Sequence, residues 1–262
     1  MAGHGNVQAW AFDKAAELLI SSHYAIGMTG AGVSVESGIP PFRGPGGLWT
    51  KHGEPPMDGY QRFLADPTGY WEARLNAPSE IVQALAQAQP NAGHYAMVEV
   101  ERMGILRHLI TQNIDNLHRA AGHQHLAEIH GNAQLLRCIG CRRRFPQEAI
   151  PIPLEALPPR CPECYGIIKA DTVHFGEPIP PDVLEVCFRE TREADCMLVA
   201  GTSALVYPAA AFPQMVKEQG GSLIEVNLYD TPLTPLADCS LMGPFAEILP
   251  ALMERVQARL TA

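Results

Sequence analysis

The sequence lacks any apolar run long enough to cross a membrane. Spanning a bilayer takes about 20 consecutive apolar residues, and no segment of the 262-residue chain approaches that length. The first residues also lack the basic start and apolar stretch of a secretory signal. Basic side chains are in deficit, because 19 Lys and Arg stand against 28 Asp and Glu and give a net charge of −9. We therefore expect a cytoplasmic protein with no membrane partner and no direct contact with nucleic acid, whose phosphates attract basic surfaces.

Cysteine is scarce and unevenly placed, which excludes a disulfide framework. Three of the seven cysteines are scattered in apolar contexts, and four form two Cys-x-x-Cys pairs, Cys138 with Cys141 and Cys161 with Cys164. This pattern is typical of a reducing compartment and a metal site. Two such pairs supply the four soft ligands of a closed tetrahedral zinc site, so we expect one structural zinc ion. Free or redox-active thiols, or a nucleic-acid zinc ribbon, are the alternatives, and we expect Arg142, Arg143 and Arg144 to form a solvated face beside the metal.

Apolar residues are plentiful, at 47% of the chain, and their pattern alternates between strands and helices. We expect strands at 25–28, 106–111, 196–200 and 222–227, with helices at 7–21, 91–103, 182–193, 209–219 and from about 247. This alternation predicts an α/β fold, a Rossmann-like parallel sheet with helices on both faces. The Gly- and Pro-rich stretch after residue 45 predicts a loop and a helical insertion. We therefore divide the chain into a Rossmann-like domain (1–45, 90–134 and 173–262), a loop with helical insertion (46–89) and a zinc-ribbon module (135–172).

A glycine turn, Gly30-Ala31-Gly32, follows the first expected strand. Glycines let a backbone approach a phosphate closely, and a helix that follows offers free N–H groups. A tight turn without a ligand is the alternative explanation. Gln112, Gly201 and Asn227 also come at or just past the ends of expected strands. Because ligands of parallel sheets bind beyond the carboxyl ends of the strands, we expect these positions to form one nucleotide site.

Two further groups carry candidate chemistry. The amides and carboxylate of Gln112-Asn113-Ile114-Asp115 could hydrogen-bond a ribose and a carboxamide. A turn in which Asp115 caps a helix is an equally good explanation. His130, in Glu128-Ile129-His130-Gly131-Asn132, could take a proton from a hydroxyl. The chain has ten histidines, and we expect three neighbours of this one to lie at the surface: His118, His123 and His125.

Taken in order, these motifs resemble the signature of the sirtuins, the NAD-dependent protein-lysine deacylases. The resemblance covers nearly the whole chain, from about residue 7 to residue 260. The chain is most similar in type to compact bacterial or archaeal members of the family. It rests on matching segments in the family's order: Gly30-Ala31-Gly32 with Ser37-Gly38-Ile39-Pro40 and Phe42-Arg43-Gly44, then Gln112 to Asp115, His130-Gly131, the four paired cysteines, Phe175-Gly176-Glu177, Gly201-Thr202-Ser203 and Asn227.

The resemblance implies a reaction in which an acyl-lysine peptide or protein and NAD yield nicotinamide, acyl-ADP-ribose and free lysine. It implies that His130 is a general base on the ribose hydroxyls, that Asn113 positions water and ribose, and that Asp115 contacts the nicotinamide amide. The implied contacts to NAD are Gly30, Ala31, Gly32, Ser34, Pro40, Phe42, Arg43, Gln112, Asn113, Asp115, Gly201, Thr202, Ser203, Asn227 and, through backbone, Phe245. The peptide is expected to add a strand along Val173, His174, Phe175, Gly176 and Glu177.

Two other functions stay open at this point. A mono-ADP-ribosyltransferase on the same fold would use the same NAD site and release different products. A zinc-stabilised sensor of NAD or ADP-ribose would bind without turnover, although a sensor has no need of a base such as His130. The sequence does not indicate an oligomeric state.

Overall fold

The centre of the computed structural model, which describes residues 2–76 and 80–261, is a parallel six-stranded sheet. Its strands follow the order β3-β2-β1-β7-β8-β9. They are β1 (Ala25–Thr29), β2 (Leu106–Thr111), β3 (Leu126–Glu128), β7 (Cys196–Ala200), β8 (Ser222–Asn227) and β9 (Cys239–Met242). Counted along the chain, this is the order 3-2-1-4-5-6 of a doubly wound Rossmann sheet. The predicted fold class is confirmed.

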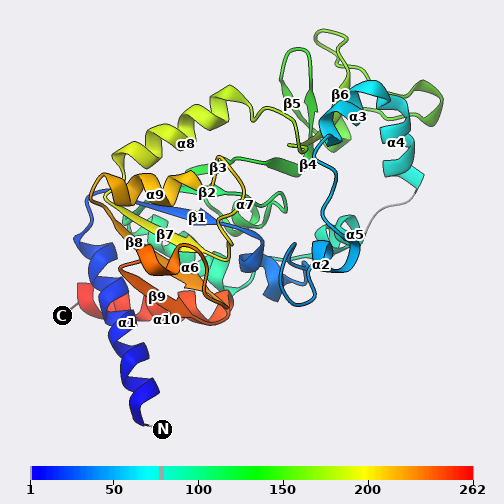
Figure 1. Ribbon diagram of the computed structural model, residues 1–262. Coiled ribbons are helices and arrows are strands. Elements are labelled where there is room, and N and C mark those ends of the chain that lie inside the picture. The colour runs from blue at the N-terminus through cyan, green and yellow to red at the C-terminus, as the bar shows by residue number, and fades with distance from the viewer. Residues whose placement is uncertain (1, 77–79, 262) are drawn as a thin grey trace.

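Helices cover both faces of the sheet (Figure 1). One face packs against α1 (Ala2–Ser21), α6 (Ala92–Arg102) and α10 (Phe245–Leu260), and the other against α8 (Pro181–Glu193) and α9 (Ala211–Glu218). Successive side chains of β7 lie on opposite faces of the sheet. Leu198 packs in the core with the first group of helices, and Val199 packs in the core with the second. Burial on both faces explains why β7 reads as a continuous apolar run. No described helix is both long and apolar enough to cross a membrane.

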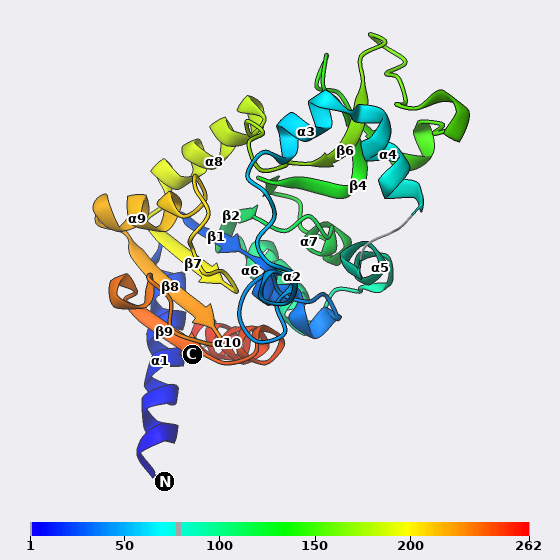
Figure 2. The ribbon, with the colours of Figure 1, turned by 45° about the vertical axis from the view of Figure 1, so that its right-hand side comes forward.

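A second lobe lies at one end of the sheet (Figures 1 and 2). It contains a three-stranded antiparallel sheet of order β5-β4-β6, formed by β4 (Gly131–Cys138), β5 (Arg144–Pro146) and β6 (Ile168–Thr172). The short helices of the insertion are α2 (Leu48–His52), α3 (Gly59–Ala65), α4 (Pro67–Asn76) and α5 (Glu80–Gln87). Trp71 of α4 is buried, and its Nε1 donates to the Ile168 carbonyl at 2.8 Å, which joins the insertion to this sheet.

The remaining regular segments are short. They are α7 (Leu117–Ala121) and the 3-10 helices η1 (Ala31–Ser37), η2 (Gln147–Ala149), η3 (Leu154–Ala156) and η4 (Thr234–Leu236). The three-stranded sheet starts at Gly131, so it begins directly after His130 rather than at residue 135. Residues 77–79 of the predicted insertion, and residues 1 and 262 of the predicted Rossmann-like domain, lie outside the described residues.

Two of the three histidines expected at the surface are buried. His118 and His123 are each 2% exposed and form a cluster with His94 of α6, in which the rings meet at tilted and edge-to-face angles. The ring centroids are 4.7 Å apart between His94 and His118, and 5.2 Å apart between His118 and His123. The expectation was wrong for His118 because α7 has only five residues, too few for the apolar pattern to show which side faces α6. His123 lies beyond α7, after Gly122, where no helical pattern applies. The side chain of His125 is exposed, as expected.

Burial keeps the three clustered histidines neutral. It lowers the pKa of His94 to about 3, with a smaller contribution from His123. Burial also lowers the pKa of His118 well below its usual value, helped by the two neighbouring rings. For His123, burial outweighs the Glu101 carboxylate, whose oxygen lies 2.6 Å from Nδ1, and the pKa is again lowered. The folded protein therefore takes up protons at these sites at a lower pH than the unfolded chain does.

We expect the protein to lose stability as the pH falls below about 6.5, where an unfolded histidine gains a proton. Because the folded pKa values are lower, the unfolded chain binds more protons, and each buried histidine costs on the order of 1 kcal/mol per pH unit. Urea denaturation between pH 7.5 and pH 5 measures this slope. The variant His118→Gln should reduce it, whereas an unchanged slope in that variant would contradict the assignment.

Candidate active site

The glycine turn after β1 packs directly on the turn after β7. The Gly30 N–H donates to the Ala200 carbonyl at 3.1 Å, and the Gly32 N–H donates to the Gly201 carbonyl at 2.8 Å. A Cβ atom at Gly32 would lie 2.7 Å from the Gly201 Cα, and one at Gly30 would lie 2.7 Å from the Thr202 Cβ. The contact between the two turns therefore requires both glycines, apart from any need of a phosphate. Ala31 begins η1, which carries the chain away from this contact.

Ser34 of η1 is fully buried and joins two of the predicted catalytic residues. Its Oγ donates to the Asp115 Oδ2 at 2.7 Å and accepts from the Asn113 Nδ2 at 3.1 Å. The other carboxylate oxygen, Asp115 Oδ1, accepts from the Leu117 N–H at 2.9 Å, at the start of α7. Burial raises the pKa of Asp115, and the Ser34 hydrogen bond only partly offsets it. One oxygen of Asp115 thus shapes the start of the helix, and the other belongs to a buried polar cluster.

Thr202 connects the ends of β2, β7 and β8. Its Oγ1 accepts from the Gln112 Nε2 at 2.9 Å, and its carbonyl accepts from the Asn227 Nδ2, also at 2.9 Å. Ser203 follows it in the chain. The polar residues predicted at the carboxyl ends of the strands are therefore linked to one another in a single network.

His130 is oriented by a backbone carbonyl at the end of β2. Its Nδ1 lies 3.0 Å from the Gln112 oxygen. Since a carbonyl can only accept, Nδ1 carries the proton and donates, which leaves Nε2 as the basic nitrogen of the neutral ring. Burial lowers the pKa of His130, while the Gln112 carbonyl raises it by a smaller amount. The ring is therefore neutral at pH 7 and able to accept a proton.

Close packing against β6 explains why the residue after His130 is a glycine. Gly131 has φ +81°, and a Cβ atom would lie 1.6 Å from the Asp171 carbonyl oxygen of β6. The Val173 N–H donates to the His130 carbonyl at 2.9 Å. The backbone of His130 is thus fixed by the strand that leads into the predicted substrate segment.

The predicted substrate segment 173–177 is a turn stabilised by its own side chains. The His174 N–H donates to the Glu177 carboxylate at 2.9 Å, and the Glu177 N–H donates to the His174 carbonyl at the same distance. Lys169, which is 1% exposed, places its Nζ 3.1 Å from the same carboxylate. Sequence reasoning missed Lys169, because β6 also contains Asp171 and Thr172 and its sequence therefore does not show that the lysine is buried.

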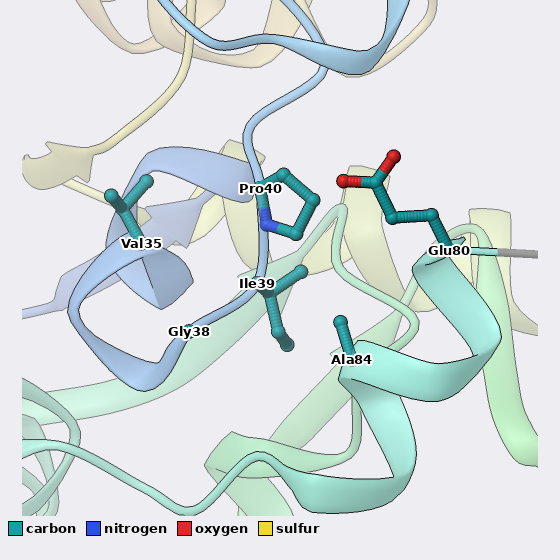
Figure 3. A pocket seen from close by; sticks show the side chains of 6 residues that line it. All are labelled: Val35, Gly38, Ile39, Pro40, Glu80 and Ala84. Atoms are coloured by element: carbon teal, nitrogen blue, oxygen red, sulfur yellow. The ribbon is translucent and has the colours of Figure 1, made fainter.

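Pro40, Phe42 and Arg43, the predicted NAD contacts in the segment after η1, have separate surroundings. Pro40 lines a hollow of about 290 Å³, together with Val35, Gly38, Ile39, Glu80 and Ala84 (Figure 3). The Phe42 ring contacts Trp49, with 5.0 Å between centroids. Arg43 forms an exposed ion pair with Glu54 at 3.0 Å.

Phe245, at the start of α10, belongs to the core. Its side chain is 3% exposed and packs against Gly93 and His94 of α6. A Cβ atom at Gly93 would lie 2.4 Å from the Phe245 ring, so the two elements are in close contact. The side chain of Phe245 is therefore not available to a ligand.

The four paired cysteines form a metal-binding cluster in the second lobe. All four Sγ atoms lie within 4.8 Å of one another. The pair distances are 3.5 Å for Cys138–Cys164 and 3.7 Å for Cys141–Cys161. A tetrahedron with Zn–S bonds of 2.3 Å has edges of about 3.8 Å, so the donor set suits zinc and leaves no open position. Each Cys-x-x-Cys turn contains the same type of backbone hydrogen bond: the Arg142 N–H donates to the Cys138 carbonyl, and the Tyr165 N–H donates to the Cys161 carbonyl.

Arg144 does not belong to a solvated face, contrary to the prediction. This half-buried side chain makes ion pairs with Asp171 and with Glu128, whose oxygen is 3.1 Å away. Glu128 ends β3, two residues before His130, and Asp171 lies in β6. Arg144 therefore connects the metal-binding lobe to the strand that leads to His130.

We expect Gly131→Ala to lower the free energy of unfolding more than Gly220→Ala does, although the two glycines have similar φ values, +81° and +87°. Placing alanine in the left-handed region costs about 1–2 kcal/mol at either site. Only at Gly131 does the new Cβ overlap backbone, whereas nothing lies within 4 Å at Gly220. Urea denaturation should show an additional loss of at least about 2 kcal/mol for Gly131→Ala. Equal losses would contradict this explanation of the His-Gly pair.

Comparisons with known proteins agree with this arrangement. The model of the Sir2 family matches residues 30–208. The NAD-dependent protein deacylase 1 of Archaeoglobus fulgidus is 41% identical over 251 residues, which cover 95% of this chain and 99% of the relative. The NAD-dependent protein deacetylase of Sulfurisphaera tokodaii is 43% identical over 252 residues, which cover 94% and 96%.

Solved structures are similar over the same length. A crystal structure of a Sir2 homolog–NAD complex has a TM-score of 0.80 at 41% identity and covers 95% of this chain and 94% of its own. A Sir2–p53 peptide–NAD+ structure has a TM-score of 0.78 at 32% identity and covers 94% and 98%. The chain belongs to the Sir2 family, the sirtuins, as the order of its motifs predicted.

Proposed function

We propose that this chain is an NAD-dependent protein-lysine deacylase that releases nicotinamide, acyl-ADP-ribose and free lysine. The observation that carries the proposal is His130, a neutral imidazole whose Nδ1 donates to the Gln112 carbonyl, which leaves Nε2 as the nitrogen that can accept a proton. The archaeal relatives named as deacylases and deacetylases support it. So do the related Sir2 structures described with NAD and with a p53 peptide.

The residues present suit NAD. A doubly wound sheet binds dinucleotides at the point where the strand order reverses, here between β1 and β7. The turns after these strands carry Gly30, Gly32 and Gly201, of which Gly32 and Gly201 are partly exposed, and glycines let a backbone approach a phosphate closely. When bound, NAD supplies the ribose carbon that receives the acyl group and the nicotinamide that leaves. The residues in contact with it would be those named from the sequence, with Phe245 contributing backbone alone.

The chain's own side chains have distinct tasks in this proposal. Asp115 and Asn113, oriented by Ser34, hydrogen-bond the nicotinamide amide and the ribose. His130 Nε2 takes the proton of a ribose hydroxyl, and Phe42 shields the reacting face from water. The acyl-lysine peptide pairs with residues 173–177, next to the His130 carbonyl.

The zinc site and the free thiols suggest where the enzyme works. All seven cysteines are free, and the four ligands need their thiolates reduced to bind zinc. The cytoplasm supplies such conditions. We therefore include a cytoplasmic location and acyl-transferase chemistry in the proposal.

We expect His130→Ala to lose deacylation by about 10²–10⁴-fold, the usual contribution of a general base. The protein is incubated with NAD and an acetyl-lysine peptide, and both products are followed by mass spectrometry. Free lysine peptide and acetyl-ADP-ribose should form in equal amounts. The matched control is His23→Ala, because His23 is exposed at the opposite end of β1 and should leave the rate unchanged.

The products separate the alternatives. ADP-ribose attached to protein, without peptide deacetylation, would replace the proposal by a mono-ADP-ribosyltransferase. Binding of NAD without its conversion to either product would replace the proposal by a non-catalytic sensor of NAD or ADP-ribose.

We expect the acid limb of kcat/KM to lie below pH 6.5. His130 acts as a base only when neutral, and burial lowers its pKa from 6.5, so activity should persist to a lower pH than an exposed histidine would allow. A pH–rate profile measures the midpoint. In the variant Asp115→Asn, kcat/KM should fall but its acid limb should remain. Disappearance of the acid limb in this variant would assign the limb to Asp115 instead of His130.

A further inference from the structure

Asn132 lies two residues after His130 and is buried, with 1% of its surface exposed. Its Nδ2 is within hydrogen-bond distance of two acceptors, the Glu128 Oε1 at 2.6 Å and the Asn116 Oδ1 at 2.8 Å. Its Oδ1 accepts from the Gln134 N–H at 2.9 Å. Because a carboxylate can only accept, the amide nitrogen is the atom that faces Glu128. Both N–H groups and the carbonyl oxygen of this side chain therefore have partners.

The first of these hydrogen bonds closes the turn that carries His130. Glu128 ends β3 and Asn132 belongs to β4, so their side chains meet across the three residues between them. Glu128 also pairs with Arg119 of α7 at 3.0 Å and with Arg144 of β5 at 3.1 Å. The backbone of His130 therefore runs through a closed loop, and the carboxylate at one end of this loop is itself held in place.

The second hydrogen bond reaches the turn that carries Asp115. Asn116 follows Asp115 directly and has φ +68°, a left-handed conformation that asparagine adopts more readily than most residues. Its side chain makes no cap hydrogen bond to α7, so its Oδ1 is left to Asn132. The backbone joins the same two turns, because the Ala133 N–H donates to the Ile114 carbonyl at 2.8 Å. One buried amide thus connects the turn of the base to the turn of the predicted nicotinamide contact.

We propose that Asn132 is a positioning residue that holds His130 and Asp115 at a fixed separation for the deacylation. It acts through the two turns rather than by contact with cofactor or peptide. Reacting groups must be held closely in place, and a misplacement of about 1 Å can cost about 10²-fold in rate. An apolar side chain of the same size would remove the amide donor of Glu128 and release Asn116, so neither turn would hold the other. This inference rests on the proposed function for the chemistry of His130.

Steady-state kinetics with NAD and an acetyl-lysine peptide tests this role. In Asn132→Leu we expect kcat to fall by about 10²-fold with little change in the KM of either substrate, because most of their contacts lie on other segments. Asn132→Ser, which keeps one donor, should lose less. The matched control is Thr191→Ala, which removes another buried hydrogen bond, from the Thr191 Oγ1 to the Cys187 carbonyl of α8 at 2.7 Å. The control should lower the free energy of unfolding and leave kcat unchanged.

The state of the His130 ring is measured without turnover. Nitrogen-15 NMR of the histidine rings distinguishes Nδ1–H from Nε2–H, and the variant His130→Ala identifies the His130 signals. In the unmodified protein we expect the Nδ1–H form, because the Gln112 carbonyl can only accept. In Asn132→Leu a loosened contact with Gln112 should give a mixture of the two forms, whereas Thr191→Ala should keep the single form. A loss of stability alone does not change this signal.

A double-mutant cycle tests the connection to the turn of Asp115. Asn116→Gly keeps the left-handed conformation and removes the Oδ1 acceptor. Its effect on kcat and that of Asn132→Leu should be non-additive, because each variant removes the same hydrogen bond. If the leucine variant does not fold, Asn132→Ser takes its place in each measurement.

The outcomes separate this inference from the proposed function. An unchanged kcat or an unchanged ring tautomer in the Asn132 variant, an equal loss of kcat in Thr191→Ala, or additive effects in the cycle would overturn the inference. Absence of deacetylation by the unmodified protein would overturn the proposed function instead, and the NMR measurement would still test the position of His130.

Discussion

The arrangement of the site depends on the contact between two backbone turns. The turn after β1 lies on the turn after β7 so closely that no side chain fits at Gly30 or Gly32. From this contact η1 leads to Ser34, which aligns Asn113 with Asp115. Across the same contact, Thr202 reaches Gln112. The polar groups are thus oriented by the protein before a ligand arrives, and preorganised dipoles cost no rearrangement during a reaction.

The second lobe completes the site from the opposite side. Gly131 starts β4, and β6 approaches it so closely that the two strands determine the backbone of His130. Arg144 adds a side-chain link, since it pairs with two buried carboxylates, Asp171 and Glu128. Removing one member of a buried ion pair leaves an uncompensated charge, so this link resists separation of the lobes. The four-cysteine cluster is therefore connected to His130 through β4, which begins at Gly131 and ends at Cys138.

Local patterns predicted the elements but not the partners of their side chains. The strands that end at or just before Gly30, Gln112, Gly201 and Asn227 were recognised because they are mainly apolar, and burial on both faces makes β7 a continuous apolar run. The exposure of His118 and His123 was predicted wrongly, because α7 is too short to show which side of it is buried and His123 lies in the irregular segment after it. Arg144 and Lys169 were missed or misassigned for a different reason. Each is a charged side chain whose meaning depends on carboxylates contributed by other segments of the chain.

The sequence by itself determined the α/β class, the order of the motifs, the four metal ligands and the family. These properties depend on residue type and spacing within short segments, where a strand, a glycine turn or a Cys-x-x-Cys pair is recognisable alone. Only the tertiary structure decided that His130 presents Nε2, that Asp115 serves both a helix start and a polar cluster, and that Asn132 links the turns that carry these two residues. These properties depend on hydrogen bonds and packing between segments far apart in the chain, and chain folding alone brings such partners together.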